Sequence, residues 1–175
     1  MPGSRLSRAL VVGAIALTPT PASAEALNLP VAARVISFVQ PPPSGTVVAA
    51  IVYDPRNPAS EAEADAIERG AGTAFAAGKA TLKFKRVPVT ALGGLAGSQV
   101  AFVTAGLREG QVQLGAAAAR QSILTITADV TCVQAGNCAV AISGGQRVQI
   151  TVSRAACKAG NLRFGSAFLM LVKEI

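Results

Sequence analysis

Residues 46–53, TVVAAIVY, constrain the fold of this chain more than any other stretch. Almost every position is apolar and favours β-structure, so the run lacks the alternation of a strand that has one face in water. Strands of this kind are buried on both faces and typically lie near the centre of a sheet. We therefore expect a central sheet whose two faces are both covered by helices.

Strand-like runs and helical stretches alternate along the chain. The expected strands are residues 81–89, 99–104 and 122–127, and the expected helices between them are residues 60–78 and 106–120. A first helix is expected to start at Asn28 and Pro30, to carry Phe38 on its apolar face, and to end before Pro41. Alternation of this kind indicates a mainly parallel sheet.

The C-terminal part of the chain predicts a hairpin followed by two short helices. Residues 138–143 and 147–153 read as two strands linked by a Gly-Gly pair. Residues 154–160 form a short helix, and residues 164–173 form a terminal helix because their apolar residues recur at helical spacing. Those apolar residues are Phe164, Phe168, Leu171 and Val172. The sequence thus predicts a single three-layer α/β domain with a mainly parallel central sheet, an antiparallel edge hairpin and helices on both faces.

Residues 1–24 have the features of a secretion signal. Two arginines precede the apolar residues 9–17, which are too few to span a bilayer, and an Ala-x-Ala cleavage site ends at Ala24. An uncleaved anchor is the alternative interpretation. We expect cleavage after Ala24, one exported domain over residues 25–175 that does not span a membrane, and a periplasmic location.

Three cysteines in an exported chain suggest one disulfide and one spare thiol. Cys132 and Cys138 flank a Gly136-Asn137 pair that can make a tight turn, so we expect these two to pair. Closing so short a loop contributes about 2 kcal/mol in the chain-entropy account. Cys157 is expected to pack as a small buried residue, and a thiol that exchanges with the disulfide is the alternative.

The sequence offers little catalytic chemistry. It contains no histidine, the commonest general base and metal ligand. Ser60 and Glu63 fit a capping box, and the carboxylates around them form either a metal or acid/base site or, in the simpler interpretation, a solvated helix face. These carboxylates are Glu61, Glu63, Asp65 and Glu68. We therefore predict a protein that is not an enzyme, with no catalytic residue, metal or cofactor.

The net charge of +7 raises the question of a nucleic-acid partner. The sequence has one basic cluster, formed by Lys83, Lys85 and Arg86, and its other basic residues are scattered. Aromatic residues are too few for stacking platforms. We interpret the cluster as a solvated strand edge and expect no nucleic-acid partner, whereas acidic lipid or protein partners remain open.

Several segments, taken in order, resemble the YfiR/HmsC-like family of exported bacterial regulators. The resemblance rests on the Phe-x-x-Pro from Phe38 to Pro41, IVYDPRNP at residues 51–58, VAFVTAGL at 100–107, SILTITAD at 122–129, and QRVQITV followed by RAACKAGNLRFGSAFLML at 146–171. It implies a periplasmic regulator that binds the sensor domain of an inner-membrane diguanylate cyclase and represses it. Cyclic-di-GMP and biofilm formation would then be under its control.

The comparison with this family also suggests where the partner binds. The first helix with Phe38 and the adjoining proline turn at Pro41 form the expected contact surface, and a homodimer is left open. The alternative function is a periplasmic small-molecule binding protein. Residues 54–58 and Asp129 follow predicted strands, which is where open α/β sheets bind ligands, although Asp129 also suits a helix cap.

Overall fold

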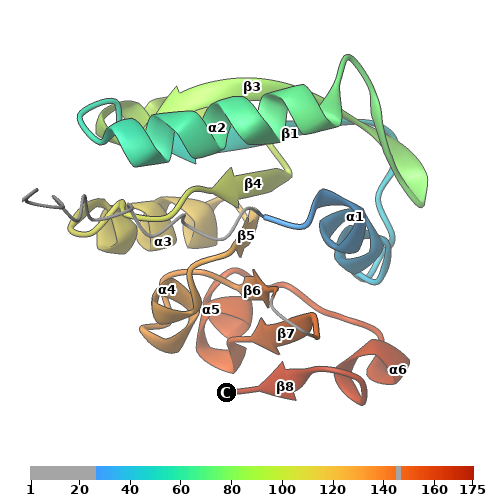
Figure 1. Cartoon of the computed structure of the whole chain (residues 1–175). Coiled ribbons are helices and arrows are strands. Elements are labelled where there is room, and N and C mark those ends of the chain that lie inside the picture. Colours follow the sequence, from blue (N-terminus) through green and yellow to red (C-terminus); the bar gives the residue numbers. More distant parts are fainter. Residues whose placement is uncertain (1–26, 145–146) are drawn as a thin grey trace, which may run out of the picture.

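The computed structural model describes residues 27–144 and 147–175. The predicted signal peptide and its cleavage site lie outside these residues. Within the described part, one eight-stranded sheet runs in the order β2-β3-β1-β4-β5-β6-β7-β8 (Figure 1). Its strands are β1 (Ser44–Tyr53), β2 (Phe75–Ala77), β3 (Lys79–Pro88), β4 (Val100–Val103), β5 (Leu124–Thr127), β6 (Val140–Ser143), β7 (Gln149–Val152) and β8 (Lys173–Glu174).

Helices cover both faces of the sheet, as predicted. They are α1 (Leu29–Ser37), α2 (Pro58–Ala71), the 3-10 helix η1 (Val89–Leu95), α3 (Gly110–Arg120), α4 (Val130–Gln134), α5 (Arg154–Ala159) and α6 (Ser166–Leu169). One core lies between the sheet and α1, α2 and α6, and the second lies between the sheet and η1, α3 and α4. The predicted three-layer α/β fold is therefore confirmed.

The sheet is mainly parallel but contains two antiparallel pairs. β1, β3, β4, β5 and β6 run parallel, and the predicted C-terminal hairpin is the antiparallel pair β6–β7. The sequence did not indicate that β8 would pair in parallel with β7 beyond that hairpin. A second antiparallel pair, β2–β3, forms the opposite edge of the sheet.

β1 is the central strand that the sequence predicts. All ten of its residues are in register with β3, from Ser44 opposite Lys79 to Tyr53 opposite Pro88, and its second half also pairs with β4. Ile51 faces the core with α1 and α2, whereas Val52 faces the core with η1 and α3, and both are fully buried. Burial on both faces explains why polar residues are missing from this run.

Helix α2 starts and ends earlier than the sequence suggested. Asn57, and not Ser60, is the N-cap, because the Asn57 side chain accepts a hydrogen bond from the Ala59 N–H at 3.1 Å and Pro58 follows it. The capping-box interpretation was therefore wrong. The helix ends at Ala71 with Gly72 as C-cap, and Gly78 instead turns the chain between β2 and β3 with a φ of 63°.

The outer edge of β3 is only partly paired. β2 covers residues 80–82, so the remaining half of β3 has no neighbouring strand on that side within the described chain. Arg86 lies in this half and binds Asp65 and Glu68 of α2, the latter at 3.0 Å. Two carboxylates of α2 therefore bind one member of the basic cluster of β3.

The C-terminal helix is much shorter than predicted. Only Ser166–Leu169 is helical, because the backbone on either side is engaged elsewhere. Phe164 forms a bridge with Val39, and the Gly165 N–H donates to the Phe38 carbonyl at 3.1 Å. After one helical turn the chain extends into β8 and completes the edge of the sheet. The apolar residues do recur at helical spacing, but hydrogen bonds to backbone that is distant in the sequence keep most of this segment from forming a helix.

The first helix matches its prediction. Asn28 caps α1 by accepting a hydrogen bond from the Val31 N–H at 3.2 Å, and Pro30 sits in its first turn. The helix ends at Ser37 with Phe38 as C-cap, before the cis peptide bond between Gln40 and Pro41. None of the helices that the structure describes combines the length and hydrophobicity needed to cross a membrane.

The turn at Gly78 allows a direct test of the packing between α1 and the β2–β3 hairpin. A Cβ atom at Gly78 would lie 2.9 Å from Cβ of Ser37, whereas a Cβ at Gly45, with a similar φ of 71°, would meet nothing within 4 Å. Gly45→Ala should lower the free energy of unfolding by about 1–2 kcal/mol, which is the cost of a left-handed backbone. Gly78→Ala should lower it further, as measured by urea denaturation, and equal losses would contradict this packing.

Candidate functional site

The carboxyl ends of β1, β3 and β4 lie at a topological switch point. After β1 the chain enters α2 on one face of the sheet and continues to β3, whereas after β4 it enters α3 on the other face and continues to β5, on the opposite side of β1. The loops after β1 and β4 therefore diverge. In open α/β sheets, ligands bind in the crevice that such a divergence leaves.

A buried hydroxyl pair holds α2 against the end of β4. The Ser60 and Thr104 hydroxyl oxygens are 2.6 Å apart and both side chains are fully buried. Thr104 donates its proton to the Val52 carbonyl at 3.1 Å, so Ser60 must be the donor to Thr104, because each hydroxyl has one proton. Ser60 also accepts a hydrogen bond from the Asp54 N–H at 2.9 Å. The loop after β1 is thereby fixed relative to β4.

Glu63 makes the second link between α2 and the loop after β4. Its side chain is 8% exposed, and Oε2 accepts a hydrogen bond from the Ala105 N–H at 2.8 Å. Oε1 is buried with no hydrogen-bond partner among the described residues. Burial raises the pKa of Glu63, the hydrogen bond from Ala105 opposes this, and repulsion from Asp129 adds to it. The prediction of a solvated carboxylate was wrong for this residue.

A sequence signal for the burial of Glu63 was present. Ser60, Ala64, Ile67 and Ala71 are buried at intervals of three or four residues, and Glu63 falls on the same face of α2. Asn57 adds a further link, since its Nδ2 donates to the Gly106 carbonyl at 3.3 Å. The start of α2 is thus tied to the loop after β4 by three polar side chains.

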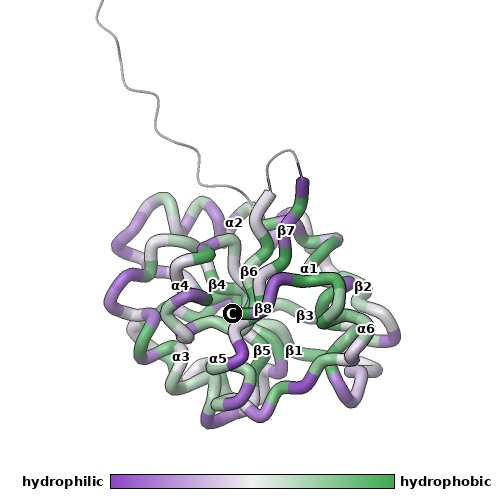
Figure 2. The backbone as a smooth tube through the Cα atoms, turned by 90° about the horizontal axis from the view of Figure 1, so that it is seen from below, coloured by the Kyte–Doolittle hydropathy of each residue, from purple (hydrophilic) through white to green (hydrophobic). Residues whose placement is uncertain are grey.

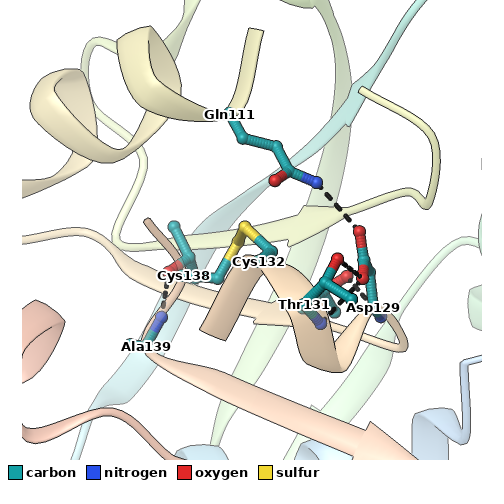
Figure 3. The surroundings of a disulfide bond; sticks show 8 residues. Gln111, Asp129, Thr131, Cys132, Cys138 and Ala139 are labelled. Atoms are coloured by element: carbon teal, nitrogen blue, oxygen red, sulfur yellow. Dashed lines mark hydrogen bonds between the residues drawn. A yellow bond between two sulfur atoms is a disulfide. The ribbon is translucent and has the colours of Figure 1, made fainter. Parts of the chain in front are cut away.

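Asp129 is a helix cap, which was the simpler of its two interpretations. Its Oδ1 accepts a hydrogen bond from the Thr131 N–H at 2.9 Å at the start of α4, and its Oδ2 accepts one from Gln111 Nε2 of α3 at 2.8 Å (Figure 3). Asp129 therefore joins α4 to α3. It does not line the pocket that contains Asp54.

We use the name switch-point pocket for a hollow of about 330 Å³ beside these loops. Its lining residues are Asp54, Arg56, Val89, Thr90, Leu107, Arg108, Glu109, Gly110 and Gln113. They come from the loops after β1 and β4 and from the first turns of η1 and α3. The predicted ligand segment at residues 54–58 contributes two of them. Sequence reasoning missed the others, because no motif connects segments so far apart in the chain.

The predicted disulfide is present. Cys132 at α4 is bonded to Cys138 just before β6, with an S–S distance of 2.06 Å (Figure 3). Both cysteines are fully buried in the core beneath α3 and α4. Cys157 is buried and not disulfide-bonded, and burial, followed by repulsion from Glu174, raises the pKa of its thiol to about 11. A thiol with this pKa is almost wholly protonated at neutral pH and is a poor nucleophile.

Phe38 and Pro41, the predicted partner-binding residues, line two different hollows. Phe38 is half-buried, and its ring stacks on that of Phe168 with 5.0 Å between centroids. Pro41 is exposed and lines a separate hollow with Gln99 and Ser122, near the amino ends of β4 and β5. The structure therefore does not bring the two residues to one site, and their role in partner binding stays a prediction.

We use the name apolar surface for the hollow of about 350 Å³ beside Phe38. Its lining residues come from α1 and its C-cap, β7, α6 and the segment between α6 and β8, and they are Arg34, Val35, Phe38, Ile150, Phe168, Leu171 and Val172. Leu171 is 82% exposed and the adjacent Met170 is 86% exposed. Figure 2 shows the hydrophobic stretch of α1 that borders it. Among its described lining residues, Arg34 is the one that carries a charge.

No family model and no curated protein matches this chain. Solved structures do share its fold. A conserved domain protein from Vibrio cholerae O1 biovar El Tor superposes with a TM-score of 0.61 at 10% identity, over 83% of this chain and 58% of that one. The ligand-free, open structure of CD0873, a substrate-binding protein with adhesive properties from Clostridium difficile, gives 0.59 at 12% identity, over 74% and 54%. The chain spans little more than half the length of both proteins.

Glu63 should make stability depend on pH. Its pKa in the folded state lies above the ordinary value of 4.5, so folding binds protons and stability should rise as pH falls through the folded-state value. Glu63→Gln keeps an acceptor for the Ala105 N–H without a charge. It should flatten this part of the pH profile and leave stability at pH 7 equal or higher, as measured by urea denaturation.

Two further variants make this test specific. Glu63→Ala removes the acceptor and should cost about 1–3 kcal/mol, because the Ala105 N–H loses its partner. Glu61→Gln alters an exposed carboxylate of the same helix that binds no residue after β4 in the described chain, and it should cost much less stability than Glu63→Ala. A profile that Glu63→Gln does not alter would contradict the raised pKa.

The disulfide also has a measurable contribution. Replacing Cys132 and Cys138 together by serine should lower the free energy of unfolding by about 2 kcal/mol, because the crosslink closes only a short loop. Peptide mapping without reduction should find Cys132 linked to Cys138 and Cys157 unmodified. A crosslink to Cys157 would contradict the assignment.

Proposed function

We propose that this chain is an exported, non-enzymatic regulator that binds and represses the periplasmic sensor domain of an inner-membrane diguanylate cyclase. The observation that carries the proposal is the apolar surface, in which Leu171 is 82% exposed, with Met170 next to it in the chain at 86%. Clustered, exposed apolar side chains around a hollow are typical of protein-binding sites. The surface includes Phe38, as the resemblance to the YfiR/HmsC-like family suggests.

The apolar surface has the composition of a contact centre. The rings of Phe38 and Phe168 stack on each other and line the hollow, together with Leu171 and Val172. Arg34 at the rim makes no ion pair among the described residues, so a carboxylate of the partner would be favoured there. Such an arrangement suits a partner that offers an apolar side chain surrounded by acidic groups.

Repression requires that the regulator bind one state of the cyclase better than the other. Shifting a partner from almost fully active to almost fully inactive needs a difference of about 5.5 kcal/mol in binding free energy. At about 25 cal/mol per Å², this corresponds to about 200 Å² of extra apolar area buried in the inactive state. Complete burial of the exposed leucine and methionine is of this order, so differential contact with the apolar surface is sufficient in magnitude.

The test compares two exposed apolar residues on different parts of the molecule. Leu171 lies in the apolar surface, whereas Val112, which is 62% exposed, lies on α3 outside it. Leu171→Ser should weaken binding to the purified sensor domain at least tenfold, because it removes the most exposed apolar side chain lining the hollow. Val112→Ser should bind as the unaltered chain does, and neither exposed substitution should impair folding.

A measurement in cells completes the test. Deletion of the gene should raise cyclic-di-GMP and surface attachment, and Val112→Ser but not Leu171→Ser should restore the original level. Unchanged cyclic-di-GMP after deletion, with the cyclase expressed, would refute the proposal. Restoration by Leu171→Ser would keep the regulatory function but remove the apolar surface from it. Detection of the chain in the periplasmic fraction of the same cells tests the predicted location.

A second candidate function is binding of a small solute. The observation in its favour is the switch-point pocket, which lies where ligands bind in open α/β sheets. The shared fold with CD0873, described as a substrate-binding protein, is consistent with it. Thermal-shift screening of the purified chain against small metabolites tests this function independently of any cyclase.

A further inference from the structure

Two guanidinium groups line the switch-point pocket, and neither is strongly engaged by the protein. We propose that this pocket binds a small hydroxylated organic anion, through a carboxylate or phosphate group held by Arg56 and Arg108. The proposal rests on the second candidate function, solute binding, and names its ligand class. It does not depend on the apolar surface or on a cyclase partner.

Arg108 is presented by a fixed loop but has no structural partner of its own. Its side chain makes no hydrogen bond or ion pair with the described residues. The loop that carries it is held from beneath, since Ala105 binds Glu63 and Gly106 binds Asn57. Arg108 itself has a φ of 45°, which a non-glycine residue adopts at a cost. A strained residue on an anchored loop is a preorganised position for binding.

Arg56 is only weakly occupied. Its Nε lies 3.4 Å from Asp54 Oδ1, at the long end of hydrogen-bond distances, and its side chain is 79% exposed. The same Oδ1 already accepts the Arg56 backbone N–H at 2.9 Å. An exposed pair of this kind contributes little, and it leaves the terminal nitrogens of the guanidinium free to bind. The planar guanidinium group matches the oxygens of carboxylate and phosphate groups, which it can bind through two parallel hydrogen bonds.

The remaining lining residues indicate hydroxyl groups on the ligand. Thr90 and Gln113 offer uncharged donors and acceptors, and Glu109 can accept hydrogen bonds from hydroxyls. Among the described lining residues none is aromatic, so a stacked aromatic ring has no platform here. Asp54 and Glu109 balance the two arginines, which disfavours ligands that carry more than one anionic group. A volume of about 330 Å³ suits a molecule the size of a sugar acid or a sugar phosphate.

The experiment is titration calorimetry of the purified chain with three probes. D-gluconate and glucose 6-phosphate carry the anionic group and the hydroxyls, and D-glucose carries the hydroxyls alone. We expect at least one of the two anions to bind at least tenfold more tightly than glucose. Comparison of the two anions distinguishes a carboxylate from a phosphate head group. Absence of binding by both anions would overturn the proposal.

Three variants locate the binding. Arg108→Gln and Arg56→Gln should each raise the dissociation constant at least tenfold, because each removes a charged fork from the anion. Arg120→Gln, at the far end of α3 and outside the pocket, should leave it unchanged. Equal weakening by Arg120→Gln would mean non-specific attraction and would overturn the site. Equal binding of glucose and the anions would leave solute binding standing but overturn the anionic ligand class.

Discussion

The pairing of β1 with strands on both sides is the constraint on which the rest of the structure depends. β3 pairs with all ten residues of β1 on one side, and β4 pairs with residues 49–52 of β1 on the other. Residues 49–52 are completely buried, so a layer must cover each face of the sheet at this strand. Because α2 follows β1 on one face of the sheet and α3 follows β4 on the other, the loops after β1 and β4 separate at its carboxyl end. The position of the switch-point pocket thus follows from the place of one apolar strand in the sheet.

Local sequence patterns were reliable where the decisive interactions are local. The apolar run of β1, the Asn28 and Pro30 start of α1, and the disulfide between Cys132 and Cys138 all depend on residues close together in the chain. The terminal helix failed because the backbone around Phe164 pairs with the end of α1, more than a hundred residues earlier. Spacing of side chains cannot reveal a backbone partner at that distance.

In the candidate sites, too, the features set by local sequence could be predicted and those set by contacts between distant segments could not. The segment with Asp54 could be placed at a strand end from sequence, because the strand itself was evident. Arg108 could not, since its relation to Arg56 arises only when two loops about fifty residues apart meet at the switch point. Phe38 could be assigned to an apolar helix face, but its neighbours Ile150 and Leu171 come from the other end of the chain. Ser60 and Glu63 looked like a local cap and instead bind residues after β4.

The half-paired outer edge of β3 has a consequence for how the chain behaves at high concentration. An uncovered strand edge offers backbone groups to the edge of another molecule, which is a route to aggregation. β2 covers only residues 80–82, and beyond them the open half carries Lys83 and Lys85, whereas Arg86 is paired with Asp65 and Glu68. Bringing two such edges together would oppose like charges and desolvate lysines. The lysine charges therefore oppose edge-to-edge association, and chemical neutralisation of these lysines would remove that protection.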